Sequence, residues 1–252
     1  MEYPKQKSKP QFDFTKEAIA IYGGNGVGKT TLVAALPLEV CTIFAERGGK
    51  KVEAFGIAVE TWEDYLEAVQ VIKNQASAKM LCIDTLPSLY QLYQNWFNRK
   101  YKIAHEGEIP FKGYSMLARG FTEAMFDLQR IGKGYILLTN SRNAEAKEGV
   151  GGIEPSIPKD KENKIWDATI GLCDYVFYIE DIMENSGGAI VPGKVIHTTA
   201  SPDYFAKSRW PFPKTTIPMA INDPAKSAKR LVKAYQMSAE SSATKTTETE
   251  TQ

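Results

Sequence analysis

One run of this chain combines the residue types and the spacing of a phosphate-binding loop. It consists of Gly23, Gly24, Asn25, Gly26, Val27, Gly28, Lys29, Thr30 and Thr31. Residues 23–30 satisfy the pattern G-x-x-x-x-G-K-[ST], in which glycines let backbone N–H groups converge on phosphate oxygens. The lysine of this pattern reaches the β- and γ-phosphates, and its last hydroxyl holds Mg²⁺. The run therefore predicts that Lys29 and Thr30 bind a nucleoside triphosphate with magnesium.

The surroundings of this run favour a phosphate loop over a glycine-rich turn that matches by chance. Apolar residues 18–22 precede it as an expected strand, and residues 31–36 follow it as an expected helix. A loop that ends a strand and opens a helix is the context that the motif requires.

A partner carboxylate for the loop follows a second apolar run. Residues 80–83 are Met, Leu, Cys and Ile, and Asp84 comes directly after them. At the end of a neighbouring strand, a carboxylate orients Mg²⁺ through its water shell. The alternative is that Asp84 caps the helix expected after it, and the two roles are compatible.

Two more polar residues follow expected strands and are predicted to reach the same sheet edge. Glu46 follows residues 40–45 and is a candidate to polarise the attacking water, with Glu60 as a weaker candidate. A surface glutamate in a turn is the alternative for Glu46. Asn140 follows residues 135–139 and is a candidate to sense the γ-phosphate. The segment 143–163 after it is long, charged and glycine-rich, which is typical of a functional or mobile loop.

These residues need a sheet whose strands alternate with helices. Strands are expected at 18–22, 40–45, 80–83, 135–139 and 175–179, and helices at 29–36, 62–75, 88–102 and 114–131. This alternation predicts an α/β fold with a mostly parallel central sheet flanked by helices. A hairpin with its turn at Pro192-Gly193 is expected at 189–199, and a last helix capped by Asp223 at 224–237.

One large domain is expected between two polar ends. Residues 1–14 are predicted to be a flexible basic arm, 15–237 one P-loop domain, and 238–252 a disordered tail. The formal net charge of +1 means that any nucleic-acid site must come from local patches. No apolar run reaches the roughly 20 residues that span a bilayer, and the first residues lack the apolar segment of a signal peptide. The three cysteines are an odd number without C-x-x-C spacing, which argues against both a disulfide framework and a zinc site. We therefore expect reduced cysteines in a cytoplasmic protein, and no membrane partner.

The order of these motifs resembles the RecA-type ATPase core. Within it, the chain is most similar to small phage-encoded RecA-core proteins, the Sak-type single-strand annealing ATPases. The likeness rests on GGNGVGKTT (23–31), FAERGG (44–49), LCIDTLPSL (81–89), KGY (112–114) and AKSRWPFP (206–213), and it extends over about residues 18–218. It implies a RecA-type P-loop NTPase core with a late β-hairpin and a C-terminal helix. It also implies ATP and Mg²⁺ as cofactors and, for a phage protein, the host cytoplasm as location.

The resemblance assigns a role to Lys207 and Arg209. In related RecA-core and hexameric helicase ATPases, a Lys-x-Arg pair on a late strand reaches the γ-phosphate bound by the neighbouring subunit. Two residues apart on an extended strand, both side chains point to the same side, and a guanidinium pairs with phosphate oxygens at fixed geometry. The alternative is a pair of solvated surface charges. The resemblance thus implies a homo-oligomer, ring or filament, with shared sites.

Single-stranded DNA is the partner that the resemblance implies. Its candidate contacts are Lys102, Phe111, Lys112, Tyr114, Arg142 and Lys147. Aromatic residues interleaved with lysines suit base stacking and backbone contacts, and the alternative is that these aromatics pack in the core. A single-strand binding protein is a further partner compatible with this role.

The predicted function is an ATPase that promotes annealing or strand pairing, with hydrolysis that is slow and stimulated by DNA. Its catalytic residues are predicted to be Lys29, Glu46, Asp84, Asn140, Lys207 and Arg209. One alternative is a helicase-related motor or loader ATPase that acts on protein partners. A second is a nucleotide-gated DNA-binding module with little hydrolysis.

Overall fold

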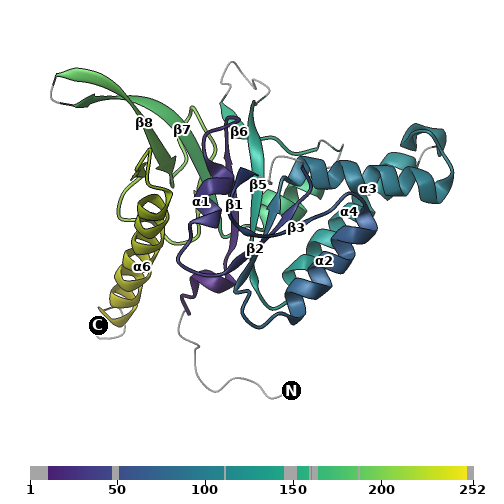
Figure 1. The fold of residues 1–252 in the computed structure, drawn as a ribbon, viewed down its shortest axis with the longest axis horizontal. Helices are drawn as coiled ribbons and strands as arrows, with labels where there is room; N and C mark the ends of the chain where they lie inside the picture. Colours follow the sequence, from purple (N-terminus) through teal and green to yellow (C-terminus); the bar gives the residue numbers. More distant parts are fainter. Residues whose placement is uncertain are drawn as a thin grey trace.

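A ten-stranded sheet forms the centre of the computed structural model, which describes residues 11–46, 51–110, 112–144, 152–158, 160, 164–186 and 188–248 (Figure 1). The strands are β1 (Ala18–Gly23), β2 (Val40–Phe44), β3 (Phe55–Ala58), β4 (Met80–Asp84), β5 (Gly134–Asn143), β6 (Ile153–Pro155), β7 (Tyr175–Ser186), β8 (Ala189–His197), β9 (Lys207–Ser208) and β10 (Thr216–Met219). Along the main path their order is β10-β8-β7-β1-β5-β4-β2-β3, while β6 pairs with β5 and β9 with β7.

The strands from β7 to β3 along this path run parallel. Their carboxyl ends therefore share one edge of the sheet, the edge at which open α/β sheets bind ligands. In the register of the strands, Gly23 lies opposite Asn140 and Phe44 lies opposite Asp84. The expected α/β fold with a mostly parallel sheet is confirmed, and β5 separates the strand before the loop from the strand that carries Asp84.

Helices cover both faces of the sheet. They are α1 (Lys29–Ala34), α2 (Trp62–Asn74), α3 (Leu86–Tyr101), α4 (Gly113–Gln129), α5 (Lys164–Trp166) and α6 (Pro224–Glu248), with short helical turns η1 (Phe14–Lys16), η3 (Glu106–Glu108) and η4 (Asp167–Gly171). Because successive strand residues face opposite sides, Ala20 and Tyr22 of β1 pack with α2, α3 and α4, whereas Ile19 and Ile21 pack with α1 and α6. None of the described helices is long and apolar enough to cross a membrane.

Helix α2 shows how local sequence sets these elements. Thr61 and Asp64 form a reciprocal capping box at its start, which satisfies two N–H groups that the first helical turn leaves free. Its buried residues recur at helical spacing and include Trp62, Tyr65 and Ile72. This amphipathic pattern places one face of the helix against the sheet.

The hairpin is longer than predicted, and the predicted turn at Pro192-Gly193 is wrong. Strands β7 and β8 pair from Tyr178 opposite His197 to Ser186 opposite Ala189, so Pro192 lies within β8. Strand β10 ends opposite Lys194, and a proline is tolerated where a strand has a neighbour on one side only. Gly188, which follows the end of β7, has φ of 91°, a conformation that suits glycine. The hairpin extends beyond the rest of the sheet (Figure 1).

Three other segments also differ from the prediction. The segment expected to be irregular after Asn143 contains β6, which pairs antiparallel with β5. The end of the expected arm is anchored, since Phe14 is buried against Tyr235 and Phe12 contacts Trp210. Helix α6 continues past 237 because Ser238 is buried and donates to the Pro211 carbonyl, and no proline or glycine interrupts residues 238–248. The predicted arm residues 1–10 and tail residues 249–252 lie outside the described residues.

Candidate nucleotide site

The loop between β1 and α1 has a backbone that only glycines adopt easily. Gly26 has φ of 76° and Gly28 has φ of 104°, in the left-handed region. A Cβ added at Gly24, Gly26 or Gly28 would meet no other heavy atom of the described residues within 4 Å. Gly23 differs, because its Cβ would lie 2.4 Å from the Ile179 carbonyl oxygen. The loop therefore presents an open cradle of backbone on one side and packs tightly against β7 on the other.

Lys29 lies inside this cradle. Its Nζ donates to the carbonyls of Gly23 (3.0 Å) and Gly24 (2.9 Å) and to Oδ1 of Asn140 (3.0 Å). Burial lowers the pKa of the ammonium, while the negative charges of Asp84 and Glu46 oppose that shift. The lysine of the loop and the Asn140 amide in β5 are thus in direct contact.

Thr30 and Asp84 form the candidate magnesium site. The Thr30 hydroxyl donates to Oδ2 of Asp84 over 2.7 Å. Burial raises the pKa of the Asp84 carboxyl, and hydrogen bonding from Thr30 opposes the rise. Hydroxyl and carboxylate oxygens are ligands that Mg²⁺ accepts, and Mg²⁺ usually completes its shell with water and substrate phosphates. The Thr30 and Asp84 oxygens therefore fit a magnesium ion shared with a phosphate. The described residues contain no cluster of three or more His, Cys, Asp or Glu that could hold a metal ion.

Glu46 lies beside this pair, where β2 ends next to β4. The backbone N–H of Ala45 donates to the Asp84 carbonyl over 2.8 Å. The Glu46 carboxylate accepts hydrogen bonds from the hydroxyls of Thr85 and, over 2.8 Å, Ser88. Thr85, joined to Asp84 by a cis peptide bond, occupies the N-cap position of α3. The alternative that Asp84 caps this helix is therefore wrong.

Glu60, the weaker candidate to polarise the attacking water, lies just before α2. Glu60 is exposed, and its backbone N–H donates to the Asp64 carboxylate at the start of α2. Residues 47–50, which include the last three residues of the FAERGG motif, lie outside the described part of the chain.

Lys207 and Arg209 lie at the opposite edge of the sheet from the phosphate loop of their own chain. Lys207 donates to the Gly171 carbonyl over 2.7 Å. Arg209 forms a 2.9 Å ion pair with Asp174, whose carboxylate also accepts from the N–H of Ala18 at the start of β1. Any contact of these two side chains with a bound triphosphate would therefore involve the loop of a second chain.

The candidate DNA contacts that the structure describes fall into two groups. Lys102, Lys112 and Tyr114 are exposed where α3 and α4 meet, and Tyr114 is 62% exposed, which disfavours a core role for it. Arg142 is engaged within the chain, since it pairs with Glu154 (2.9 Å) and donates to the Ile157 carbonyl (2.6 Å). Phe111 and Lys147 lie outside the described residues.

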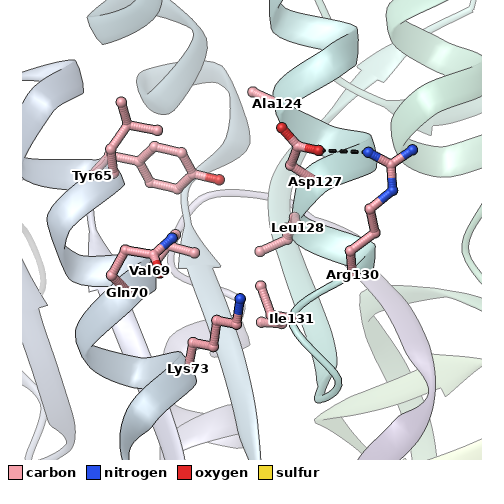
Figure 2. Close-up of a pocket in the computed structure, with 10 residues that line it drawn as sticks. Tyr65, Val69, Gln70, Lys73, Ala124, Asp127, Leu128, Arg130 and Ile131 are labelled. Carbon is pink, nitrogen blue, oxygen red and sulfur yellow. Dashed lines mark hydrogen bonds and ion pairs between the residues drawn. The ribbon is translucent and has the colours of Figure 1, made fainter.

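A cavity of about 290 Å³ lies between α2 and α4, away from the phosphate loop (Figure 2). Lys73 belongs to the last turn of α2 and Arg130 is the C-cap residue of α4, where it pairs with Asp127 over 2.8 Å. Cations at these positions complement the negative ends of the helices. Their position at the helix ends therefore explains the presence of Lys73 and Arg130 at this cavity, and no bound ligand is needed to explain it.

Comparison with known proteins identifies the family of this chain. A search of curated proteins finds no match. A family model described as an AAA domain matches residues 15–210, a range that contains the phosphate loop, Glu46, Asp84, Asn140 and Arg209. The match covers most of the chain, which therefore belongs to the AAA domain family of P-loop ATPases.

Proposed function

We propose that this AAA-domain chain hydrolyses ATP and acts on single-stranded DNA, in annealing or strand pairing, as do the phage Sak-type proteins that it resembles. The observation that carries the ATPase part is the convergence of Lys29, Thr30 with Asp84, and Glu46 at one sheet edge. They come from three separate parts of the chain, residues 29–30, 46 and 84, and together they provide the groups that hydrolysis of a triphosphate needs.

Lys29 and the loop would bind the phosphates. In this structure the ammonium is bonded to two loop carbonyls and to Asn140, and phosphate oxygens would replace these acceptors. The backbone cradle beside Gly24, Gly26 and Gly28 has room for them. Bound Mg²⁺, held by Thr30 and Asp84, would neutralise charge that develops on the phosphate oxygens.

Glu46 would orient the attacking water and accept its proton. Its carboxylate is held by the Thr85 and Ser88 hydroxyls, so its position is set by the start of α3. A base whose position is fixed loses little entropy at the moment of reaction.

Asn140 would connect the nucleotide to the segment after β5. Its side chain accepts from Lys29, while its backbone carbonyl accepts from the N–H of Ser156 over 2.7 Å. Removal of the γ-phosphate would change the partners of Lys29 and, through Asn140, the residues that flank β6. This link is a route by which hydrolysis could alter DNA contacts.

The oligomeric part of the proposal is supported by the location of Lys207 and Arg209. Both lie at the sheet edge opposite the phosphate loop of their own chain, and the Arg209 side chain is 62% exposed, so Arg209 is accessible to a neighbouring subunit. Lys102, Lys112 and Tyr114 are the exposed candidates for DNA contacts. A single-strand binding protein is a proposed further partner.

One observation favours a second candidate, the nucleotide-gated DNA-binding module with little hydrolysis. The hydroxyls of Thr85 and Ser88 both donate to Oε1 of Glu46, so this oxygen is already engaged within the chain and the carboxylate is less available to a water molecule. In such a module ATP would control DNA affinity without turnover.

The deciding experiment measures ATPase rate with and without single-stranded DNA at two salt concentrations, because phosphate contacts weaken with salt. Lys29→Ala is the negative control, because it lacks the phosphate-binding lysine. Arg209→Ala tests whether a neighbouring subunit completes the ATP site. Stimulation by DNA that both variants lose would support the proposal. Turnover indifferent to DNA would overturn the DNA role in favour of a motor that acts on proteins, and ATP-dependent DNA binding without turnover would favour the gated module.

A further inference from the structure

Lys194 of β8 reaches the phosphate loop from the hairpin. Its Nζ donates to the backbone carbonyl of Val27 over 3.0 Å and lies 3.4 Å from Oδ1 of Asp181, the residue opposite it on β7. The Lys194 side chain is 24% exposed, whereas that of Asp181 is 68% exposed. The contact joins residues 167 positions apart, and no motif in the sequence marks it.

The carbonyl that Lys194 binds belongs to the peptide unit that also carries the N–H of Gly28. In a planar trans peptide, the C=O and the following N–H point in opposite directions. A donor fixed on the Val27 carbonyl therefore directs the Gly28 N–H to the other side of the unit. Gly28, with φ of 104°, has no side chain to hold this orientation by packing.

A charged donor does more than hold the peptide unit in place. Hydrogen bonds to a charged group are shorter and stronger than neutral ones. Polarisation of a carbonyl also makes the N–H of the same amide a better donor. Both effects would favour an anion on the N–H side of the loop, where the cradle is open.

The geometry points to Lys194 as a positioning residue for phosphate binding. It acts through the Val27–Gly28 peptide and from the side opposite the phosphates, and Asp181 orients its ammonium. The inference rests on the proposed nucleotide site. It adds that the β7–β8 hairpin supports the phosphate loop, so that nucleotide affinity depends on the position of the hairpin.

The test compares Lys194→Met, Lys194→Arg and Lys133→Met. Lys133 is a matched control, because its ammonium also donates to backbone carbonyls, those of Gln75 (3.0 Å) and Ala78 (2.7 Å), but next to the amino end of β5. Affinity for a non-hydrolysable ATP analogue with Mg²⁺ is measured by calorimetry, the melting temperature of each variant is recorded, and steady-state kinetics follow.

We expect Lys194→Met to weaken analogue binding about tenfold, as loss of a hydrogen bond from a charged group implies. KM should rise with little change in kcat, because a uniform binding interaction is removed. Lys194→Arg should restore most of the affinity, and Lys133→Met should bind as the unaltered protein does, whatever its melting temperature.

Equal affinity of Lys194→Met and the unaltered protein would overturn the inference while leaving the proposed function intact. Equal weakening by Lys133→Met would also overturn it, because the effect would then be one of general stability. If Lys194→Met does not fold, Lys194→Gln replaces it. Weaker binding of the ATP analogue by this variant would support the inference, and unchanged binding would refute it. Failure of the unaltered protein to bind the analogue would overturn the proposed function together with this inference.

Discussion

The Thr30 hydroxyl donates to the Asp84 carboxylate over 2.7 Å, across 54 residues of sequence. Thr30 lies in the first turn of α1 and Asp84 ends β4, and β5 lies between the strands that lead to them. The bond therefore spans the carboxyl edge of the sheet. It holds two candidate magnesium ligands together in the protein itself, so binding of the metal would need little rearrangement of either side chain.

Alanine at Gly23 should lower the stability of the protein, whereas alanine at the neighbouring Gly24 should lower its affinity for nucleotide. Gly23→Ala places a Cβ 2.4 Å from the Ile179 carbonyl, and such overpacking costs about 1–3 kcal/mol of unfolding free energy. Gly24→Ala meets open space, so its stability should change by no more than about 0.5 kcal/mol while nucleotide affinity falls because the methyl group enters the cradle. Denaturant unfolding and calorimetric titration separate the two effects. An equal loss of stability in both variants would contradict this account of the loop.

Glu46→Gln should reduce turnover without loss of nucleotide binding. The amide cannot accept the proton of the attacking water, and loss of a general base lowers kcat by about 10²–10⁴-fold. Thr85 and Ser88 can still donate to the amide oxygen, so the side chain should keep its position. Single-turnover hydrolysis and analogue affinity are the measurements. Unchanged slow hydrolysis would identify the gated module instead.

Mixing two inactive variants should restore ATPase activity if the site is shared between subunits. Lys29→Ala removes the phosphate-binding lysine, and Arg209→Ala removes the proposed contribution from the neighbour. A mixed oligomer contains some interfaces at which both residues are intact. Arg209→Ala by itself should change stability by less than about 1 kcal/mol, because the Arg209 side chain that pairs with Asp174 is 62% exposed. Absence of recovery on mixing, with oligomers still formed, would count against a trans role.

Stability should depend on pH through Glu17. Burial is the main reason that the pKa of its carboxyl rises from 4.5 to about 7, and the negative charge of Asp174 adds to this rise. The hydrogen bond with Tyr235 and the positive charge of Arg209 oppose it. Because the folded state holds this proton more tightly, the stabilising contribution is complete below pH 4.5 and is lost as the pH rises to about 7.

Glu17→Gln removes this titration and keeps an acceptor for the Tyr235 hydroxyl. We expect the variant to gain on the order of 1 kcal/mol over the unaltered protein at pH 8, after allowance for solvent screening, and to show no such gain at about pH 4.5. Denaturant midpoints at several pH values provide the comparison. A constant difference across this range would contradict the assignment to Glu17.

Much of the sheet and most of the candidate site could be predicted from local sequence. The strands that end near Gly23, Glu46, Asp84 and Asn140 are short apolar runs, and the parallel arrangement of β-α-β units brings their carboxyl ends to one edge. Residue type and position along the chain were therefore sufficient to group these side chains.

The less regular elements could not be placed in this way. Pro192-Gly193 has the composition of a turn, yet the ladder between β7 and β8 runs through it because the partner strand continues. Strand β3 is a short edge strand that contains a glycine, and its pairing with β2 is what makes it a strand. Ser238 continues α6 because a carbonyl at Pro211 accepts its hydroxyl.

The sequence by itself determined the phosphate loop, the strand-helix alternation and the polar residue that ends each central strand, since these depend on backbone preferences and apolar patterns within a few residues. Only the tertiary structure decided that Lys29 contacts Asn140, that Glu46 is held by Thr85 and Ser88, that Arg209 lies away from its own loop, and that Lys194 supports that loop. Each of these depends on which strands are neighbours and on the reach of one side chain across them, and no local pattern encodes either.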